Sequence, residues 1–305
     1  MSMKFERLGT GSVVPLITPL NPDETVDLDG VVKLVAHQLR RGTNGLFPMG
    51  TSGEFARLLP AQQERLLEAV SACNGGESAL YIGVGGEGTQ RVIQHMKDRL
   101  RYRPDAFVCT LPYYYKAVTV REQLMFFSAV AQASQVPLVL YNIPGRIGNS
   151  IHLEILPELA ASGNIVAFKD SSGDKDYLLE TIRRCEPLGI RVLTGAEGLA
   201  AFGYAHGASG IVPSLGNPYP GVFVKQYEAA VQGDTQTVEE LQTVIDQINR
   251  HNKMVAGSTA VVGLRKVLME RKGICGRTMT SPWAELPETL TNQVILEAEA
   301  LERYE

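Results

Sequence analysis

The chain has 305 residues, of which 44% are hydrophobic and 20% are charged, and its formal net charge is −4. This composition is typical of a soluble globular protein with a large core, and neither the charge nor any basic run favours a nucleic-acid partner. No apolar stretch reaches the length of a membrane span, and the first residues lack the apolar core of a signal peptide. The four cysteines and five histidines are scattered, without disulfide or metal-ligand spacing. We therefore expect a cytoplasmic protein with no metal site, no membrane partner and no nucleic-acid partner.

Short apolar runs alternate with longer segments of helical periodicity eight times along the chain. The expected strands are Val13–Ile17, Gly45–Met49, Ala79–Val84, Ala106–Thr110, Pro137–Tyr141, Ile165–Lys169, Arg191–Thr194 and Ser209–Val212. Runs such as Leu138-Val139-Leu140 are continuously apolar, as expected of parallel strands that are covered on both faces. Eight β-then-α units over roughly 230 residues predict an α/β fold of the closed (β/α)₈ TIM-barrel type. A doubly wound open sheet is the alternative.

The helical segments carry end signals that agree with this alternation. In the segment Asp27–Arg41, apolar residues recur on one helical face, with Asp27 before the helix and Gly42 after it. Pro60 is placed to open the second helix.

After about Tyr219 the strand pattern ceases and helical periodicity continues. It runs through Val238, Leu241, Ile245 and Ile248, then Val261–Met269, then Leu290–Leu301. No long linker separates these segments from the barrel, so we expect extra C-terminal helices packed on it. The predicted division is a barrel with the active site at residues 1–225 and a helical extension at 226–305.

A glycine-rich stretch between a strand and a helix has the outline of a dinucleotide site. It reads Gly83-Val84-Gly85-Gly86-Glu87-Gly88. A nucleotide fingerprint also needs an acidic residue at the end of the next strand, and here that strand ends in Thr110-Leu111-Pro112. We therefore expect a tight turn of the barrel and no nicotinamide cofactor; a nicotinamide enzyme is the weaker alternative.

In a barrel, active-site groups follow the carboxyl ends of the strands. The second strand is followed by Gly50-Thr51-Ser52-Gly53-Glu54, whose hydroxyls and backbone N–H groups suit a carboxylate or a phosphate. The fourth strand is followed by Tyr113-Tyr114-Tyr115, and the fifth by Tyr141 through Arg146. The sixth strand ends at Lys169, whose amine is poorly solvated there, which favours its neutral and nucleophilic form.

This set of residues indicates imine chemistry. A lysine attacks a keto group, and the resulting imine is an electron sink for making or breaking a carbon–carbon bond. A tyrosine with a hydroxyl partner can shuttle the protons, and Thr51 and Ser52 can hold the carboxylate of a keto acid.

The residues named above resemble those of the dihydrodipicolinate synthase and N-acetylneuraminate lyase superfamily of class I, pyruvate-dependent aldolases. The resemblance rests on Gly50-Thr51-Ser52-Gly53-Glu54, Tyr141-Asn142-Ile143-Pro144 and Lys169-Asp170, and it covers nearly the whole chain. It implies that Lys169 forms the imine with pyruvate, that Tyr141 transfers protons and that no cofactor is needed.

The resemblance also implies roles for the other residues. Thr51 relays protons between Tyr141 and Tyr114, and Tyr114 reaches in from a neighbouring subunit, which implies a homo-oligomer that is a dimer of dimers. Ser52 holds the pyruvate carboxylate. Gly195 and Ile211 line the pocket.

The second substrate is an aldehyde, and the residues support two readings of it. Arg146 stands where dihydrodipicolinate synthases bind the carboxylate of the aldehyde partner, so the leading interpretation is a synthase-like condensation. Tyr114-Tyr115-Lys116 resembles 2-keto-3-deoxy-sugar-acid aldolases instead, and cleavage of such an acid is the alternative. A barrel that binds a keto acid without turnover is the non-enzymatic alternative.

Overall fold

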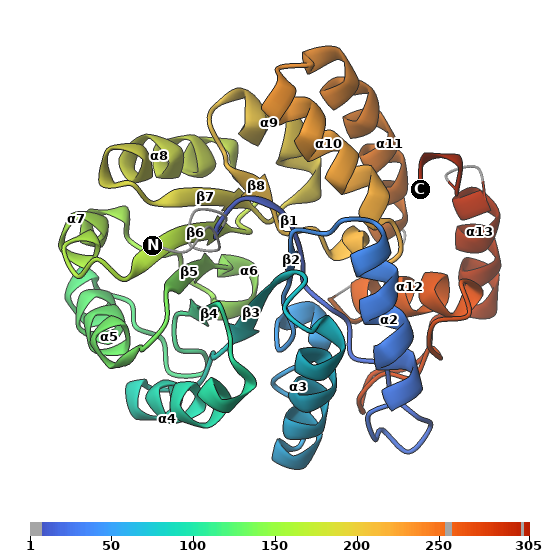
Figure 1. Cartoon of the computed structure of the whole chain (residues 1–305), viewed down its shortest axis with the longest axis horizontal. Helices are drawn as coiled ribbons and strands as arrows, with labels where there is room; N and C mark the ends of the chain where they lie inside the picture. Colours follow the sequence, from blue (N-terminus) through green and yellow to red (C-terminus); the bar gives the residue numbers. More distant parts are fainter. Residues whose placement is uncertain (1–7, 254–257, 300–301) are drawn as a thin grey trace. The chain divides into compact units, whose positions relative to one another are not determined.

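Eight parallel strands, hydrogen-bonded in chain order, form a closed barrel (Figure 1). The structure is a computed structural model that describes residues 8–253, 258–299 and 302–305. The strands are β1 (Gly11–Val14), β2 (Gly45–Leu46), β3 (Ala79–Gly83), β4 (Ala106–Thr110), β5 (Leu138–Asn142), β6 (Ile165–Asp170), β7 (Arg191–Thr194) and β8 (Gly210–Ile211). The predicted (β/α)₈ barrel is confirmed. A doubly wound sheet is open and has two edge strands, whereas this sheet is closed, so that alternative is excluded.

Helices follow the strands as the sequence predicted. Those between the strands are α2 (Leu28–Arg40), α3 (Pro60–Asn74), α4 (Thr89–Arg99), α5 (Val120–Ala133), α6 (Pro144–Ile147), α7 (Leu156–Ala160), α8 (Lys175–Cys185) and α9 (Ala200–Ala205). The Asp27 side chain caps α2 by accepting a hydrogen bond from the Gly30 N–H, and Pro60 is the first residue of α3. Gly42 follows Arg41, the C-cap residue of α2, and has a φ of +72°. All three end signals in the sequence are therefore confirmed.

The C-terminal part of the chain is helical. It contains α10 (Pro220–Gln232), α11 (Thr235–Lys253), α12 (Ser258–Arg271) and α13 (Glu288–Glu299). The last three coincide with the three periodic segments predicted from the sequence. Leu301, the end of the third predicted segment, lies outside the described residues.

The first two strands are displaced or shorter than the sequence predicted. The structure ends β1 at Val14 and β2 at Leu46, whereas the predicted strands extend to Ile17 and Met49. Pro15 directly follows β1 and Pro48 lies two residues after β2, and neither has the N–H group that a central strand needs. Two backbone bonds still join the segments beyond the strand ends: the Phe47 N–H donates to the Val14 carbonyl oxygen at 2.8 Å, and the Leu16 N–H donates to the Phe47 carbonyl oxygen at 3.0 Å.

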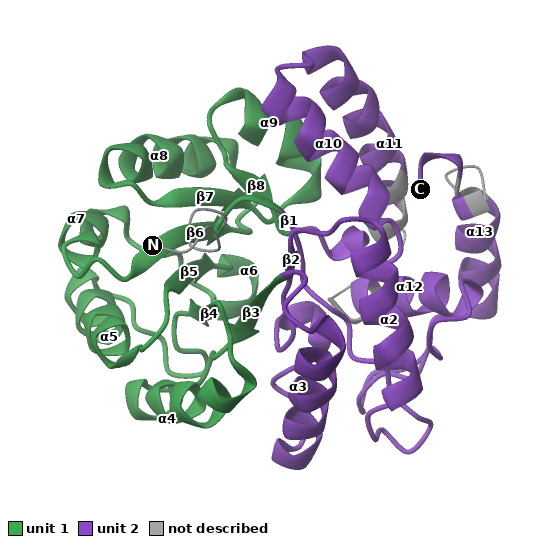
Figure 2. Cartoon of the chain, in the orientation of Figure 1, with its two compact units in different colours: residues 1–11, 79–212 green, residues 12–78, 213–305 purple. Residues whose placement is uncertain are grey.

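The chain divides into two compact units (Figure 2). Unit 1 comprises residues 1–11 and 79–212, and unit 2 comprises residues 12–78 and 213–305. The division predicted from the sequence, at residue 225, follows the point where strands cease and stays a prediction. In unit 1 the core includes Phe107, Leu140 and Phe168, each at most 1% exposed. Burial of each such side chain contributes about 1.5–3 kcal/mol.

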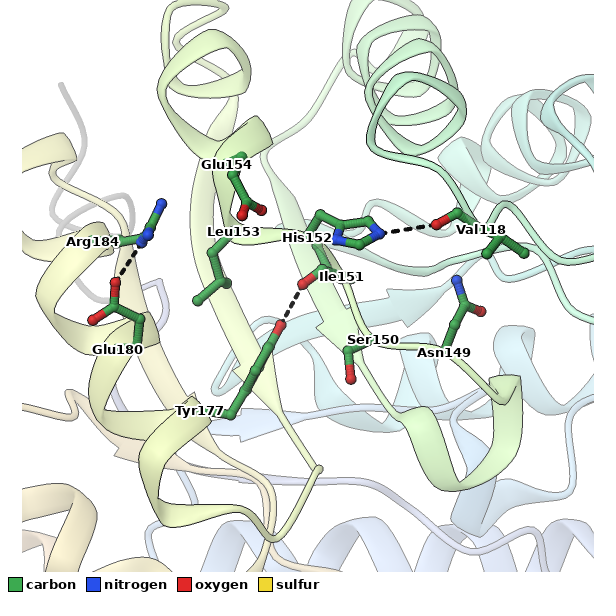
Figure 3. Close-up of a pocket in the computed structure, with 10 residues that line it drawn as sticks. All are labelled: Val118, Asn149, Ser150, Ile151, His152, Leu153, Glu154, Tyr177, Glu180 and Arg184. Atoms are coloured by element: carbon green, nitrogen blue, oxygen red, sulfur yellow. Dashed lines mark hydrogen bonds and ion pairs between the residues drawn. The ribbon is translucent and has the colours of Figure 1, made fainter.

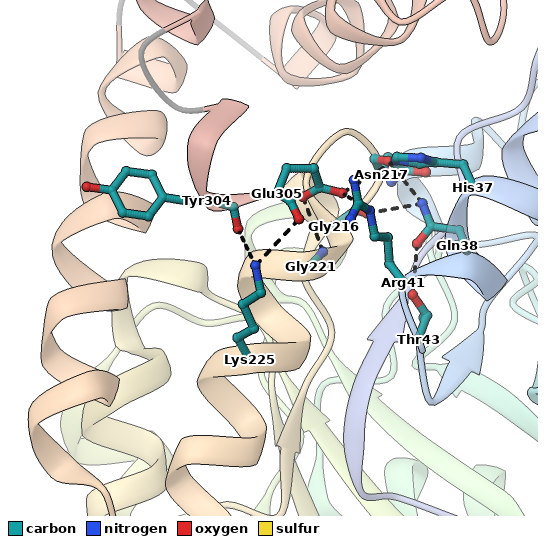
Figure 4. A network of polar contacts seen from close by, with 10 residues as sticks. All are labelled: His37, Gln38, Arg41, Thr43, Gly216, Asn217, Gly221, Lys225, Tyr304 and Glu305. Carbon is teal, nitrogen blue, oxygen red and sulfur yellow. Dashed lines mark hydrogen bonds and ion pairs between the residues drawn. The ribbon is translucent and has the colours of Figure 1, made fainter.

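In unit 2, polar contacts join segments that are about 200 residues apart. The Gln38 side chain donates to the carbonyl oxygens of Gly216 and Asn217, at 3.1 and 2.9 Å (Figure 4). The Ile17 N–H in turn donates to Asn217 Oδ1 at 2.9 Å. Because all of these groups are buried, each bond satisfies polar atoms that water cannot reach.

The last residue of the chain joins the same network. The Glu305 carboxylate, 3% exposed, lies 3.3 Å from Arg41 Nε and 3.9 Å from His37 Nε2 (Figure 4). Burial, together with the charges of Lys272, Arg40 and Arg41, lowers the pKa of His37 to about 4. A hydrogen bond between His37 and the Pro218 backbone opposes this shift.

His37 is expected to make the protein less stable in acid. Its pKa falls from the ordinary 6.5 to about 4 on folding, so its contribution is complete above pH 6.5 and is lost as the pH falls from 6.5 towards 4. We expect wild type to lose about 2–3 kcal/mol more than His37→Gln over this interval. Urea unfolding of both proteins near neutral pH and near pH 4.5 measures this difference. Equal losses in the two proteins would contradict the assignment.

Candidate active site

Lys169 and Tyr141 form a buried pair on neighbouring strands of unit 1. Lys169 on β6 is 4% exposed and Tyr141 on β5 is 5% exposed. The parallel register places the two residues opposite each other, so their side chains leave the same face of the sheet. Lys169 Nζ lies 3.7 Å from the centroid of the Tyr141 ring. The structure thus brings together the two residues that the sequence predicted as amine and proton carrier.

The register of this pair depends on a β-bulge at the start of β6. Leu138 pairs with Ile165, but the next pair is Val139 with Ala167, so Val166 is an extra residue. A slip of one residue moves a side chain to the opposite face of a sheet. The bulge is therefore what places Lys169 opposite Tyr141.

A polar clasp fixes the ends of the two strands immediately after this pair. Asn142 Nδ2 donates to Asp170 Oδ1 at 2.7 Å, and Ser172 donates to Asp170 through its N–H and its hydroxyl at 3.1 and 2.8 Å. Asn142 Oδ1 accepts from the Ile151 N–H at 3.0 Å. Burial raises the pKa of Asp170, and its hydrogen bonds to Asn142 and Ser172 oppose this shift. The clasp thus holds the two strand ends immediately after Tyr141 and Lys169.

Gly195 lies directly against Lys169. Its N–H donates to the Asp170 carbonyl oxygen at 2.6 Å, and a Cβ at this position would lie 3.0 Å from Lys169 Cε and would collide with the Ser171 hydroxyl. Ile211, on β8, pairs with Thr194 and is 0% exposed. Of these two predicted pocket residues, Gly195 is the one whose lack of a side chain allows Ser171 and Lys169 to approach its backbone closely.

Arg146 interacts electrostatically with Tyr141. It belongs to α6, a single turn that follows β5, and its side chain is exposed. Partial burial of the guanidinium lowers the pKa of Arg146, and its electrostatic interaction with Tyr141 opposes this shift. A cation at this position can attract an anionic group of a ligand near the Tyr141 phenol.

Tyr114 does not lie with the buried pair. Its side chain is 81% exposed, its φ is +69°, and its ring meets that of Tyr115 edge to face, with centroids 4.8 Å apart. Tyr113, in contrast, is partly buried, and burial together with the Glu87 carboxylate raises its pKa to about 12. Tyr114 and Tyr115 are thus both turned to solvent, and Tyr114 has a backbone conformation that non-glycine residues seldom adopt.

Thr51 and Ser52 lie in a strained loop of unit 2. They begin a short 3₁₀ turn, Thr51–Gly53, that follows β2, and both are partly exposed. Met49 and Glu54, at the two ends of this loop, have φ values of +61° and +58°. Left-handed backbone at two non-glycine residues costs free energy and persists only where the surroundings impose it.

Buried contacts impose this conformation. Glu54 Oε1 lies 2.6 Å from Lys266 Nζ, with both side chains 0% exposed, and Glu54 Oε2 accepts from the N–H and hydroxyl of Thr280 at 2.8 and 2.7 Å. The Thr18 hydroxyl donates to the Gly53 carbonyl oxygen at 2.7 Å. Burial lowers the pKa of Lys266, and the neighbouring Glu54 carboxylate opposes this shift. The carboxylate of Glu54 is therefore an anchor of the loop.

A groove of about 420 Å³ lies elsewhere on unit 1 (Figure 3). It is lined by Val118, Asn149, Ser150, Ile151, His152, Leu153, Glu154, Tyr177, Glu180 and Arg184. The Tyr177 hydroxyl donates to the Ile151 carbonyl oxygen at 2.7 Å, and burial raises the pKa of Tyr177. Since the Ile151 N–H binds Asn142, this wall of the groove supports the clasp. None of the site residues predicted from the sequence lines the groove.

The part of the chain that the structure describes has neither a metal-binding cluster nor a membrane-spanning helix. Among residues 8–253, 258–299 and 302–305, no three His, Cys, Asp or Glu side chains are grouped so as to hold a metal ion. Over the same residues no helix has the length and apolar character needed to cross a membrane. The four cysteines are free thiols.

Comparison with known proteins identifies the family. The model of the dihydrodipicolinate synthetase family matches residues 9–300. The chain belongs to this family. Members of the dihydrodipicolinate synthetase family are lyases of the aldolase type, and the chain is therefore an enzyme of that class.

Individual relatives agree with the family match. A DapA-like lyase of Halobacterium salinarum is 31% identical over 258 residues, which are 84% of each chain. A 4-hydroxy-tetrahydrodipicolinate synthase of Methanospirillum hungatei is 28% identical over 95% of this chain and 97% of its own. Among solved structures, the dihydrodipicolinate synthase of Aquifex aeolicus has a TM-score of 0.88 at 26% identity, covering 97% of this chain and 98% of that one. YagE of Escherichia coli, solved with pyruvate, has the same fold, with a TM-score of 0.90 at 24% identity over 97% and 99% of the two chains.

Sequence reasoning missed the parts of the site that hold the predicted residues in place. The bulge at Val166, the Asn142–Asp170 clasp and the Glu54–Lys266 pair are all absent from the prediction. Lys266 lies within a predicted helix, and the signal that could have marked it is a charged residue on an otherwise apolar face. Asn142 and Asp170 stand in the motifs quoted above, but the motifs alone assign them no role.

Proposed function

We propose that Lys169 forms a Schiff base with pyruvate. The amine adds to the keto carbon and water leaves, and loss of a proton from the methyl carbon then gives an enamine that attacks the carbon of an aldehyde. Hydrolysis of the product imine frees the lysine, and cleavage runs through the same steps in reverse. The observation that supports this proposal is the buried pair of Lys169 and Tyr141, with 3.7 Å between the amine and the ring centroid.

The other predicted residues receive their roles within this proposal. Tyr141 transfers the protons, with Thr51 as relay to Tyr114, and Ser52 binds the pyruvate carboxylate. Gly195 and Ile211 form part of the pocket wall. We further propose a homo-oligomer, a dimer of dimers, in which Tyr114 acts in a neighbouring subunit. The exposure of Tyr114 and Tyr115, 81% and 77%, supports this, because exposed aromatic side chains favour interfaces.

Borohydride reduction in the presence of pyruvate tests the Schiff base. Reduction converts the imine to a stable secondary amine, which intact-mass measurement and peptide mapping locate. An adduct on Lys169 is the expected result. Absence of an adduct in the folded protein, or an adduct on another lysine alone, would refute the proposal.

Gly195→Ala is expected to slow adduct formation at least about tenfold, because the new Cβ takes up space beside the lysine. The rate of adduct formation at fixed pyruvate concentration is the measurement. Gly88→Ala is the matched control: a Cβ there would meet no atom within 4 Å. A Gly195→Ala protein that reacts as fast as wild type would show that this space is not used.

For the second substrate we propose an aldehyde that carries a carboxylate, as in a synthase-like condensation, with Arg146 as its anchor. The electrostatic interaction of Arg146 with Tyr141 supports this choice. Cleavage of a 2-keto-3-deoxy sugar acid is the second candidate, supported by Tyr114-Tyr115-Lys116. Arg146→Ala separates the two. We expect it to lower kcat/KM for aspartate semialdehyde about 100-fold, the loss of a charge-assisted bidentate contact. A change of less than about threefold, together with retained cleavage of sugar acids, would favour the aldolase.

A further inference from the structure

Arg265 is a buried arginine on α12 that contacts Ser214 in unit 2, and Ser214 in turn is bonded to Ser52. Its side chain is 1% exposed, and its Nε donates to Ser214 Oγ at 3.3 Å. The Ser52 hydroxyl also donates to Ser214 Oγ, at 3.3 Å. Both serines are partly exposed. The three side chains therefore form a polar chain that leads from a cation withdrawn from water to two accessible hydroxyls.

Lys266, the next residue on α12, makes a different contact. Lys266 pairs with Glu54, whose second carboxylate oxygen is bound by Thr280. Lys266 is thus part of the loop anchor, whereas the Nε of Arg265 is directed to a hydroxyl. Burying a guanidinium costs free energy, and its field acts strongly on polar groups near it because little water screens it.

We propose that Arg265 is a positioning residue for the carboxylate of the 2-keto acid, acting through Ser214 on Ser52; this rests on the proposed binding of that carboxylate by Ser52. A guanidinium only donates, so Ser214 Oγ accepts from Arg265 and keeps its own hydrogen. Each serine has one hydrogen. When Ser52 turns its hydrogen to a carboxylate it no longer donates to Ser214, and Ser214 donates to Ser52 instead.

With the carboxylate bound, the hydrogen bonds run in a single direction, from Arg265 through Ser214 and Ser52 to the anion. Each bond polarises the next, which strengthens the last one. Without the guanidinium, the two hydroxyls bond to each other with no preferred direction, and Ser52 is not held ready to donate. Arg265 thus lowers the pyruvate concentration needed to fill the site without contacting pyruvate.

The test compares pyruvate with its uncharged methyl ester in the borohydride assay. Arg265→Met is expected to raise the pyruvate concentration for half-maximal adduct formation at least about tenfold, with the rate at saturation changed by less than about threefold. For the methyl ester, which has no carboxylate, the concentration for half-maximal adduct formation should differ by less than about twofold between wild type and Arg265→Met. Arg265→Lys, which keeps the charge, should fall between wild type and Arg265→Met for pyruvate. Arg271→Met, an exposed position on the same helix, is the control.

A second variant tests the route through Ser214. In a Ser214→Ala background, Arg265→Met should add less than about twofold to the half-saturating concentration, because the link is already broken. Two results would assign Arg265 a merely structural role. One is that Arg265→Met raises the half-saturating concentrations of pyruvate and of its ester equally. The other is that the effects of Arg265→Met and Ser214→Ala on pyruvate are fully additive. If Arg265→Met does not fold, Ser214→Ala alone must show the same selectivity for pyruvate over the ester, and its failure to do so overturns the inference. Absence of any adduct in wild type would instead refute the Schiff base itself.

Discussion

Replacement of Lys169 by methionine is expected to lower turnover of the pyruvate-dependent reaction by at least about 10⁴-fold. Methionine fills the volume of the lysine stem in the buried site but has no amine to form an imine. The rest of the pocket, including Tyr141 and Gly195, stays in place, so binding of pyruvate should weaken far less than turnover. Steady-state rates and the borohydride-dependent gain in mass, measured on the same preparations, check both statements.

Lys175→Met is the matched control for this substitution. Lys175 is exposed at the start of α8, six residues beyond Lys169, and we expect its loss to change turnover by less than about twofold. A Lys169→Met protein that retains wild-type turnover would show that another group carries the reaction. Retained turnover with a pyruvate adduct on a different lysine would identify that group.

Replacement of Lys266 by methionine is expected to cost about 3–5 kcal/mol of the free energy of unfolding. The Lys266 and Glu54 side chains are both 0% exposed, with Nζ and Oε1 2.6 Å apart, so the single substitution leaves a buried carboxylate without its cation. The loop that carries Thr51 and Ser52 would also lose the contact that holds its left-handed end at Glu54. We therefore expect weaker pyruvate binding as well as lower stability, measured by urea unfolding and by half-saturation of adduct formation.

A double substitution separates charge from packing. Glu54→Gln in the Lys266→Met background removes the unpaired charge and keeps an oxygen that can accept from Thr280, so stability should recover by at least about 2 kcal/mol. If the losses of stability caused by Lys266→Met and by Glu54→Gln alone add in the double variant, the cost of Lys266→Met comes from packing. The ion pair is then not what fixes the loop.

The closed barrel could be predicted because the local patterns agree with the global fold. The continuously apolar Leu138-Val139-Leu140 requires cover on both faces, which α/β architecture supplies. Asp27 and Pro60 mark helix starts by chemistry that depends only on their immediate neighbours. The ends of β1 and β2 were wrong although Pro15 and Pro48 were visible in the sequence, because the apolar pattern outweighed the missing N–H groups.

The residues at strand ends could be predicted, but not what aligns them. The extra residue Val166 in β6 has no local signature, since a bulge is a property of the pairing between two strands. The buried pair of Glu54 and Lys266 joins positions more than 200 residues apart, and a sequence pattern that places charges at the surface does not find it. Arg265 was missed for the same reason. The orientation of Tyr114 depends on its positive φ, which an aromatic residue seldom adopts.

The make-up of unit 2 has a consequence for how the protein is made. Its two segments, residues 12–78 and 213–305, are separated by residues 79–212 of unit 1. The bonds that join them, such as Ile17 to Asn217, Glu54 to Thr280 and Glu24 to Ser281, form only once the last third of the chain exists. On a ribosome, the second segment trails the first by on the order of ten seconds. During that time residues 12–78 expose apolar surface, while residues 79–212 can already pack among themselves. Chaperones that hold nascent chains are therefore expected to bind residues 12–78. Crosslinking of pulse-labelled, stalled chains that end near residue 212 should detect chaperones bound to this segment.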